Sequence, residues 1–209
     1  MTLSYDTIIS VTHAHEVTRD DIVAVARRVL EDAGGEAVTM RRLAAELGTS
    51  YQVVYSRVGG KPEVLRAVHD EGFETLSDPA ALAALPLTEG GPAALHRVAV
   101  GYLDFAVANP RLFDVMFGDP LPGTTRDERM REVERAAFRV CWVAPTRDWL
   151  DREHPGRPRG SASRLAWRLW SAVHGITVLH LAGHDTPSGD VRAEVAGVVD
   201  LLLADPLRR

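Results

Sequence analysis

The chain has 209 residues, a net charge of −5 at neutral pH, 45% hydrophobic residues and 25% charged residues, a composition typical of one or two folded domains. No apolar run approaches the roughly 20 residues that cross a bilayer, and the start lacks the basic and apolar regions of a secretory signal, so no membrane partner is expected. The single Cys141 excludes an internal disulfide framework and favours a reducing, cytoplasmic location.

Helical signals begin after a short N-terminal segment. Residues 1–17 show no hydrophobic period, and we expect them to form an arm. Thr18 is a good helix cap and is followed by two aspartates, which suit the positive end of a helix dipole. An apolar stripe then recurs every three to four residues until Gly34, so the sequence predicts a helix at 18–33.

The most informative stretch is 38–61, which places two short helices around a glycine turn. Thr39 and Ser50 are the caps of these helices, and Gly48 supplies the positive φ that a sharp turn between helices needs. Two helices fixed at an angle, with the second offered outward, suit the major groove of DNA. A fourth helix is predicted from Pro62 to about residue 76.

The remaining pattern is helical as well. It predicts helices at 93–109, 110–117, 126–150, 161–182 and 189–204, with a helical turn at 80–85, a loop at 119–125 and a kink or split at Pro145. No period-2 strand pattern occurs. The predicted fold class is all-α, with an arm at 1–17, a three-helix helix-turn-helix DNA-binding domain at 18–78 and a helical ligand-binding and dimerisation domain at 79–209.

The overall negative charge hides a local positive region. Between residues 39 and 61, four cations stand against one carboxylate, and Lys61 is the only lysine in the chain. Phosphate binding depends on local cations that displace counterions, so a net charge of −5 does not exclude a DNA partner.

Several segments resemble the DNA-binding domain of the TetR family of bacterial transcriptional repressors. They are 22–33, 39–48, Thr49-Ser50, Val54-Tyr55, Gly59 and 61–65. The runs YLDFAVANPRLFDVMF (102–117) and WSAVHG (170–175) resemble a subgroup of that family named for a Trp-His-Gly element. The chain departs from the family pattern at Arg57, Val58 and Gly60, where the family usually has His, Phe, and Ser or Asp.

The resemblance and the helix geometry together suggest the DNA contacts. We expect Thr39, Tyr55 and Lys61 to bind phosphates, and Ser50, Tyr51 and Gln52 to read base edges. The full predicted set is Thr39, Arg41, Thr49, Ser50, Tyr51, Gln52, Tyr55, Arg57 and Lys61. Two plainer interpretations remain: Arg41 and Arg42 belong to a solvated helix face, or Tyr55 belongs to the core.

The C-terminal helices carry a cluster of aromatic residues. The resemblance implies that a small, largely apolar effector binds among them, and aromatic pockets of this kind are common. The predicted pocket residues are Phe105, Phe113, Met116, Phe117, Trp142, Trp167, Trp170 and His174. The alternative is that these side chains are only the core of a helical domain.

The resemblance further implies a homodimer that binds a palindromic operator and is released by its effector. The last two helices are apolar enough to pair with their copies, and the interface candidates are Leu165, Leu169, Val195, Val198 and Leu202.

No cofactor or metal is expected, although His13 with His15 and His180 with His184 are possible ligand pairs. Asp127, Glu128, Glu132 and Glu134 are interpreted as a solvated face. The alternatives are a helix-turn-helix regulator without an effector, and an enzyme built on the C-terminal helices.

Overall fold

The structure is a computed structural model that describes residues 16–78, 92–118 and 126–207. The described residues form helices joined by short turns, with no strand among them, which confirms the predicted all-α class. Most of the predicted arm, the helical turn at 80–85 and the loop at 119–125 lie outside the described residues. None of the described helices combines the length and the apolar character that crossing a bilayer requires.

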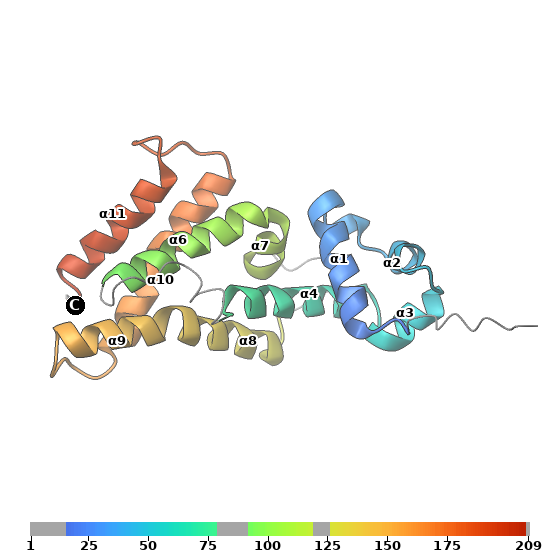
Figure 1. Cartoon of the computed structure of the whole chain (residues 1–209), viewed down its shortest axis with the longest axis horizontal. Coiled ribbons are helices and arrows are strands. Elements are labelled where there is room, and N and C mark those ends of the chain that lie inside the picture. Colours follow the sequence, from blue (N-terminus) through green and yellow to red (C-terminus); the bar gives the residue numbers. More distant parts are fainter. Residues whose placement is uncertain (1–15, 79–91, 119–125, 208–209) are drawn as a thin grey trace, which may run out of the picture.

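The first helices form a small head at one end of the molecule (Figure 1). Helix α1 (Arg19–Ala33) begins with a reciprocal cap, in which the Asp21 amide donates to Thr18 Oγ1 over 3.1 Å and the Thr18 amide donates to Asp21 Oδ2 over 2.9 Å. A single 3₁₀ turn, η1 (Gly35–Ala37), then leads into the next helix. The predicted start and end of the first helix are confirmed.

The second and third helices have the predicted caps and turn. Helix α2 (Met40–Glu46) is capped by Thr39, and α3 (Tyr51–Val58) is capped by Ser50. The turn between them contains Gly48 at φ 62°, a backbone conformation that other residues rarely adopt. The caps and the glycine turn therefore set the angle between the two short helices, and Leu43 and Val54 hold them in the core.

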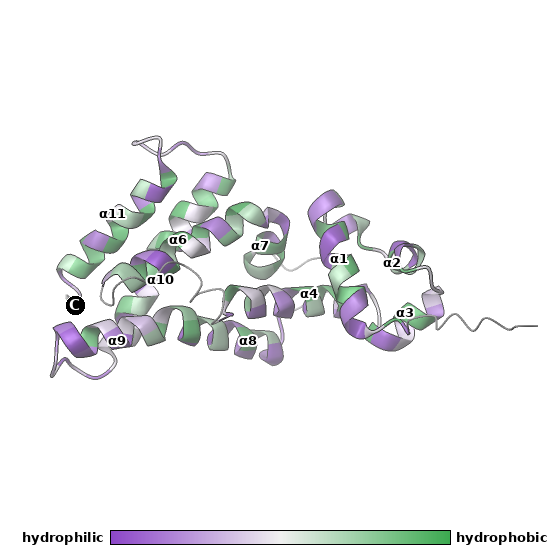
Figure 2. Ribbon diagram, viewed as in Figure 1, coloured by the Kyte–Doolittle hydropathy of each residue, from purple (hydrophilic) through white to green (hydrophobic). Residues whose placement is uncertain are grey.

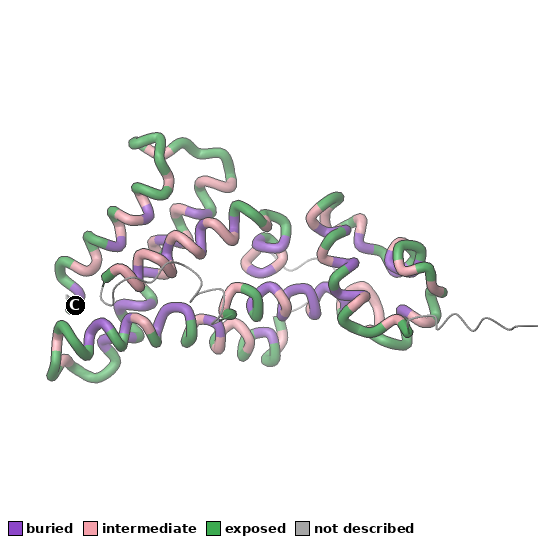
Figure 3. The backbone as a smooth tube through the Cα atoms, viewed as in Figure 1, coloured by how far each residue is buried: buried purple, intermediate pink, exposed green. Residues whose placement is uncertain are grey.

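Helix α4 (Lys61–Leu76) runs from the head into the C-terminal body. It packs on α1 of the head and on α7 and α8 of the body. Figure 3 shows buried residues along the middle of this helix, between Val64 and Phe73. A helix that is close-packed against both parts is poorly able to bend or slide independently of either.

The C-terminal body is built from six α-helices in the described residues. They are α6 (Pro92–Ala108), α7 (Pro110–Phe117), α8 (Glu128–Phe138), α9 (Ala144–Glu153), α10 (Ser161–Leu181) and α11 (Val191–Ala204). Helices α6, α10 and α11 pack on one another, and α10 also contacts α9. Figure 2 shows apolar residues concentrated along these helices where they face their neighbours.

The predicted long helix around Pro145 is continuous but contains a wider turn. Residues Arg139–Val143 form a π-helical turn, η2, between α8 and α9. The amide of Ala144 reaches back to the carbonyl of Arg139, five residues earlier. Because Pro145 has no amide hydrogen to donate, the irregular turn accommodates it without ending the helix.

Two hydrophobic clusters hold the molecule together. The first joins the head to the body, because it includes Leu112, Met116 and Ala137 beside the buried residues of α1 and α4. The second fills the body between α6, η2, α9, α10 and α11. The first cluster thus extends across the predicted boundary at residue 79, and that division into domains stays a prediction.

Gly72 marks the closest approach of α4 to α7. A Cβ atom at this position would lie 2.6 Å from Met116 Sδ and 3.2 Å from Leu112 Cδ1. In a solvated helix, Gly→Ala usually stabilises the fold. At Gly72 the added methyl must instead push a fully buried Met116 side chain out of place.

We therefore predict that Gly72→Ala lowers the free energy of unfolding by about 1–2 kcal/mol, measured by urea denaturation. Met116→Ala vacates the space, so the same glycine substitution should cost less in that background. Additive effects of the two substitutions would show that the two helices do not meet in this way.

Candidate DNA interface and effector cavity

The exposed face of α3 carries the residues expected to read bases. Val54 is fully buried and anchors the helix to the head, whereas Ser50 and Gln52 are exposed. Tyr51 and Tyr55 are 48% and 49% exposed, which excludes the interpretation of Tyr55 as a core residue. Large aromatic side chains that remain half exposed need a reason, and a partner surface is one.

The two tyrosines form one unit on this face. Their ring centroids are 6.0 Å apart and the ring planes differ by 15°, as expected for residues one helical turn apart. Gln52 lies beside them with its amide available for hydrogen bonds. The face therefore offers apolar rings, phenolic hydroxyls and an amide, a combination that suits base edges and thymine methyl groups.

The cations around this face are arranged in ion pairs. Arg42 and Arg28 donate to Glu46, Arg57 donates to Glu16, and Lys61 Nζ lies 3.6 Å from Glu36 Oε2. The hydrogen bonds that Glu46 accepts from Arg28 and Arg42 lower the pKa of its carboxyl group. Exposed pairs such as these contribute little stability, so a phosphate can replace the carboxylate.

Two of the remaining predicted DNA residues are also accessible. Arg41 is exposed on α2, and Thr39 is exposed at its N-terminus. The Thr39 hydroxyl accepts the Arg42 amide hydrogen over 3.2 Å and still has its own hydrogen to donate. Thr49 is half-buried in the turn, and its amide donates to the Ala44 carbonyl.

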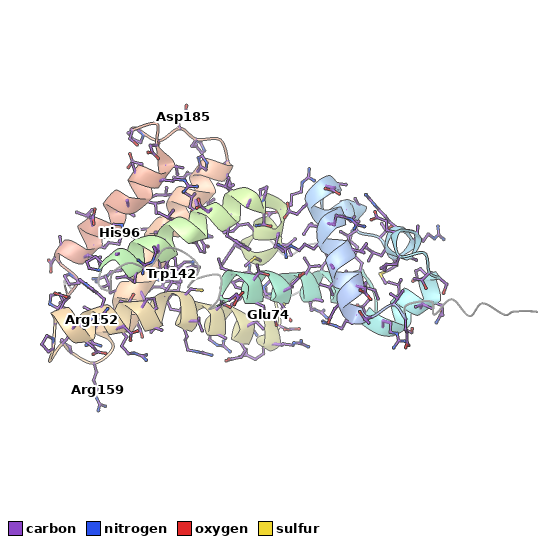
Figure 4. All side chains as sticks on the ribbon, viewed as in Figure 1. Glu74, His96, Trp142, Arg152, Arg159 and Asp185 are labelled. Atoms are coloured by element: carbon purple, nitrogen blue, oxygen red, sulfur yellow. The ribbon has the colours of Figure 1, made fainter. Side chains whose placement is uncertain are left out.

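An aromatic cavity lies where α4, α6, α7, α8 and α10 meet. It has a volume of about 100 Å³ and is partly open to solvent. Figure 4 shows Trp142, one of its wall residues, among the helices of the body. The wall consists of Phe73, Leu76, Tyr102, Phe117, Arg126, Glu134, Ala137, Phe138, Cys141, Trp142 and Trp170. The C-terminal body therefore contains a largely aromatic cavity next to α4.

A polar triad lies beside this cavity. Trp170 Nε1 donates to Tyr102 Oη over 3.3 Å, and Tyr102 Oη lies 2.8 Å from His174 Nδ1. An indole nitrogen only donates, so the tyrosine oxygen accepts this bond; when the His174 hydrogen is on Nε2, the tyrosine hydroxyl can donate to Nδ1. Burial raises the pKa of Tyr102 and lowers the pKa of His174, so both side chains favour the neutral form.

The predicted pocket residues divide into three groups. Phe117, Trp142 and Trp170 line the cavity. Phe113 and His174 line, together with Phe117, an open groove between α7 and α10. The prediction was wrong for Met116, which is buried against α4, and for Trp167, which is 57% exposed on the outside. Phe105 is half-buried and lines neither cavity.

The predicted dimer residues also need a correction. Leu165, Leu169 and Val195 are at most 1% exposed, because they pack in the core of their own chain. A side chain without accessible surface cannot contact a second subunit, so this part of the prediction was wrong. Val198 and Leu202 are partly exposed. Helices α10 and α11 expose other apolar side chains, namely Val178, Leu179 and Leu201.

Glu134 was misinterpreted as part of a solvated helix face. Its side chain is 26% exposed and lines the cavity. Its Oε1 lies 3.3 Å from Nε2 of His69, a buried residue on α4, and 3.7 Å from Nε of Arg126. His69, Tyr102 and Arg126 are not predictable as site residues from the sequence, because each occurs in a run that looks like ordinary core or surface.

The described residues contain no group of three or more His, Cys, Asp or Glu side chains that could hold a metal ion. Of the two histidine pairs, His13 and His15 lie outside the described residues. His180 is half-buried at the end of α10, and His184 is exposed beyond it.

Two family models match this chain. Residues 22–68 match the model described as bacterial regulatory proteins of the tetR family, and residues 95–204 match the tetracyclin repressor-like C-terminal domain. The chain belongs to the TetR family. Members of this family are regulators of transcription, so the chain is a DNA-binding regulator and not an enzyme. The narrower assignment to the Trp-His-Gly subgroup stays a prediction.

Individual relatives agree with this assignment. The chain is 33% identical to the HTH-type transcriptional repressor DrrR1 of Streptomyces coeruleorubidus over 118 residues, which are 56% of this chain but only 42% of that protein. A protein of unknown function from Rhodococcus sp. RHA1 has a TM-score of 0.75 and 26% identity, covering 93% of this chain and 97% of its own. A tetR-family transcriptional regulator from Streptomyces coelicolor shares the fold, with a TM-score of 0.70, 19% identity and coverage of 90% and 81%.

The lowered pKa of His174 predicts a pH effect on stability. On acidification, the unfolded chain takes up a proton at this residue before the folded protein does. The stability that the neutral His174 side chain contributes is therefore complete above the pKa of histidine in the unfolded chain, near 6.5. This stability is lost as the pH falls through that value. Between about pH 7.5 and 5, urea denaturation should show a steeper loss of stability for the unmodified protein than for His174→Gln.

His184→Gln, at the exposed residue beyond α10, is the matched control and should follow the unmodified protein. Parallel curves for the unmodified protein and His174→Gln would contradict the assignment of a neutral, half-buried imidazole.

Proposed function

We propose that this chain is a homodimeric repressor whose two α3 helices enter successive major grooves of a palindromic operator. The observation that carries the proposal is the exposed face of Tyr51, Gln52 and Tyr55 on a helix whose Val54 is fixed in the core. One short helix reaches only a few base pairs, so two-fold pairing of subunits supplies the second half-site, about 34–36 Å away. The similarity to a transcriptional repressor supports repression as the outcome.

The phosphate contacts come from the edges of that face. Thr39 and Lys61 stand at the N-termini of α2 and α4, where free amide groups also attract an anion. Tyr55 and Arg57 lie toward the end of α3, and Arg41 extends the cationic rim from α2. In the proposed complex, the phosphates replace Glu36 and Glu16 as partners of Lys61 and Arg57.

Replacing Lys61 tests the phosphate role. We expect Lys61→Ala to weaken binding by a similar factor for every duplex and to reduce the salt slope of log K by about one. Fluorescence anisotropy on operator and unrelated duplexes at several salt concentrations measures both quantities.

Two further variants act as controls for this experiment. Glu36→Gln removes the carboxylate that faces Lys61, so it should strengthen binding to all duplexes at low salt. Gln52→Ala should instead alter base preference, by about 1–3 kcal/mol at one position of the site. An unchanged affinity for Lys61→Ala would contradict the proposed interface.

The proposed dimer surface is formed by α10 and α11. Leu179 and Leu201 are 55% and 72% exposed, and each lies one helical turn after an exposed glycine, Gly175 or Gly197. A Cβ at either glycine would meet nothing within 4 Å in the single chain. Exposed leucines beside glycines allow helices of two subunits to approach closely and bury apolar surface.

We expect the double substitution Leu179→Glu with Leu201→Glu to produce a monomer, because a dimer would bury four unpaired carboxylates. Sedimentation measures the mass, and circular dichroism checks that the helices persist. Val107→Glu on α6, at a valine that is 49% exposed, is the matched control and should remain dimeric. A dimeric double variant would rule out this surface.

The aromatic cavity is the proposed effector site. A void-free C-terminal core would have favoured a regulator without an effector, and the aromatic lining of this cavity of about 100 Å³ favours control by a small, largely apolar molecule. Helix α4 forms part of the cavity wall through Phe73 and Leu76. An effector that prefers one position of α4 shifts the dimer toward a spacing of the heads that no longer fits the operator.

A further inference from the structure

We propose that the aromatic cavity selects a cationic aromatic ligand, with the Glu134 carboxylate as the group that recognises its positive charge. The inference rests on the proposed function, since it specifies the chemical class of the effector. It is carried by the ring-lined wall and by the contacts of Glu134.

The walls of the cavity present many aromatic faces and edges. Six rings contribute, and most neighbouring centroids lie 5–6 Å apart: Phe73 to Phe117 at 5.1 Å, Phe138 to Trp170 at 5.7 Å and Tyr102 to Trp142 at 5.8 Å. Aromatic faces attract a cation, and the attraction grows when water is excluded. An aromatic ligand additionally gains ring contacts in such a site.

The polar part of the wall has one full negative charge. Burial raises the pKa of the Cys141 thiol to about 12 and also raises the pKa of Tyr102, so both groups remain neutral. Glu134 and Arg126 are therefore the charged side chains of the wall among the described residues. Whether the cavity prefers a cation or an anion depends on which of these two side chains is free to bind a ligand.

Arg126 is already engaged by the end of α7. Its Nη2 donates to the carbonyl of Met116 over 2.9 Å and to the carbonyl of Gly118 over 3.4 Å. Carbonyl groups at the C-terminus of a helix carry partial negative charge, which this guanidinium offsets. Its Nε lies 3.7 Å from Glu134 Oε1, beyond hydrogen-bonding distance.

Glu134 retains a free oxygen. The contacts to His69 and Arg126 both involve Oε1, and within the described part of the chain Oε2 has no recorded partner. The side chain is three-quarters buried, so water solvates it only partly. A ligand ammonium can bind this oxygen in a charge-assisted hydrogen bond while its rings occupy the aromatic wall.

The same carboxylate is joined to the helix that leads to the DNA head. His69 is buried on α4, with Nε2 at 3.3 Å from Glu134 Oε1 and Nδ1 at 3.1 Å from Asp70 Oδ1. Its ring also packs against Phe73, a wall residue, with centroids 4.9 Å apart. A cation at Oε2 of Glu134 therefore binds the same carboxylate as a hydrogen bond of α4, which couples the ligand to the proposed lever.

Three probes of similar shape and different charge test the inference. They are 2-naphthylmethylammonium, 2-naphthalenemethanol and 2-naphthylacetate, titrated into the DNA-free protein by calorimetry. We expect the ammonium to bind about tenfold more tightly than the alcohol, and the carboxylate to bind most weakly. Glu134→Gln, which keeps the acceptor for His69 but removes the charge, should abolish the preference for the ammonium.

Glu132→Gln is the matched control, because Glu132 is exposed on the same helix and pairs with Arg135 and Arg139 outside the cavity. It should retain the preference of the unmodified protein, and circular dichroism checks that both variants keep their helices. Three outcomes would overturn the inference: tighter binding of the carboxylate probe, a charge preference that survives in Glu134→Gln, or no binding of any probe. Because no DNA is present, these outcomes are independent of the Lys61 experiment, whose failure would count against the proposed function itself.

Discussion

The burial of α4 in the cluster that joins head and body is the constraint on which the rest of the structure depends. Val64, Val68 and Phe73 of α4 lie in the same cluster as Leu112 and Met116 of α7. Close-packed interiors transmit a displacement instead of absorbing it. The contact between Gly72 and Met116 leaves no room for an extra atom, so α4 and α7 must move together or change their packing. The head and the cavity thus share one stiff element.

A second connection fixes the angle between head and body. At the start of α7, the amide of Leu112 donates to Glu31 Oε1 over 2.7 Å, which sets a carboxylate of α1 at a helix N-terminus. Arg27 on α1 reaches Asn109 over 3.1 Å and Glu71 on α4 over 3.4 Å. Two connections define an orientation where one would leave a hinge. A ligand beside α4 therefore acts against polar contacts on α1 as well as against apolar packing.

Local chemistry was predictable from the sequence, and long-range pairing was not. Thr18, Thr39, Ser50 and Gly48 have their predicted roles because caps and turns depend on neighbours within a few residues. Glu134 belongs to a run of alternating charges, and its environment is decided by His69, which lies 65 residues earlier. Helix α10 is apolar on more than one face, so its sequence does not reveal that Leu165 faces its own core while Leu179 faces outward. The exposed face of α3 was more predictable, because a short helix with one buried anchor, Val54, leaves most of its other side chains exposed.

The electrostatics of the head bear on how the proposed complex achieves selectivity. Residues 18–78 contain eight basic and eleven acidic side chains, and the cations around α3 hold carboxylates in the free protein. Binding therefore exchanges a carboxylate for a phosphate at Arg57 and at Lys61, at a cost of up to about 1 kcal/mol for each exposed pair. The same cost applies to every duplex, so it lowers non-specific affinity without altering base preference. Occupancy then depends more strongly on the base contacts of Tyr51 and Gln52. A regulator with an acidic head gives up affinity for DNA in general and keeps its ability to distinguish one site from another.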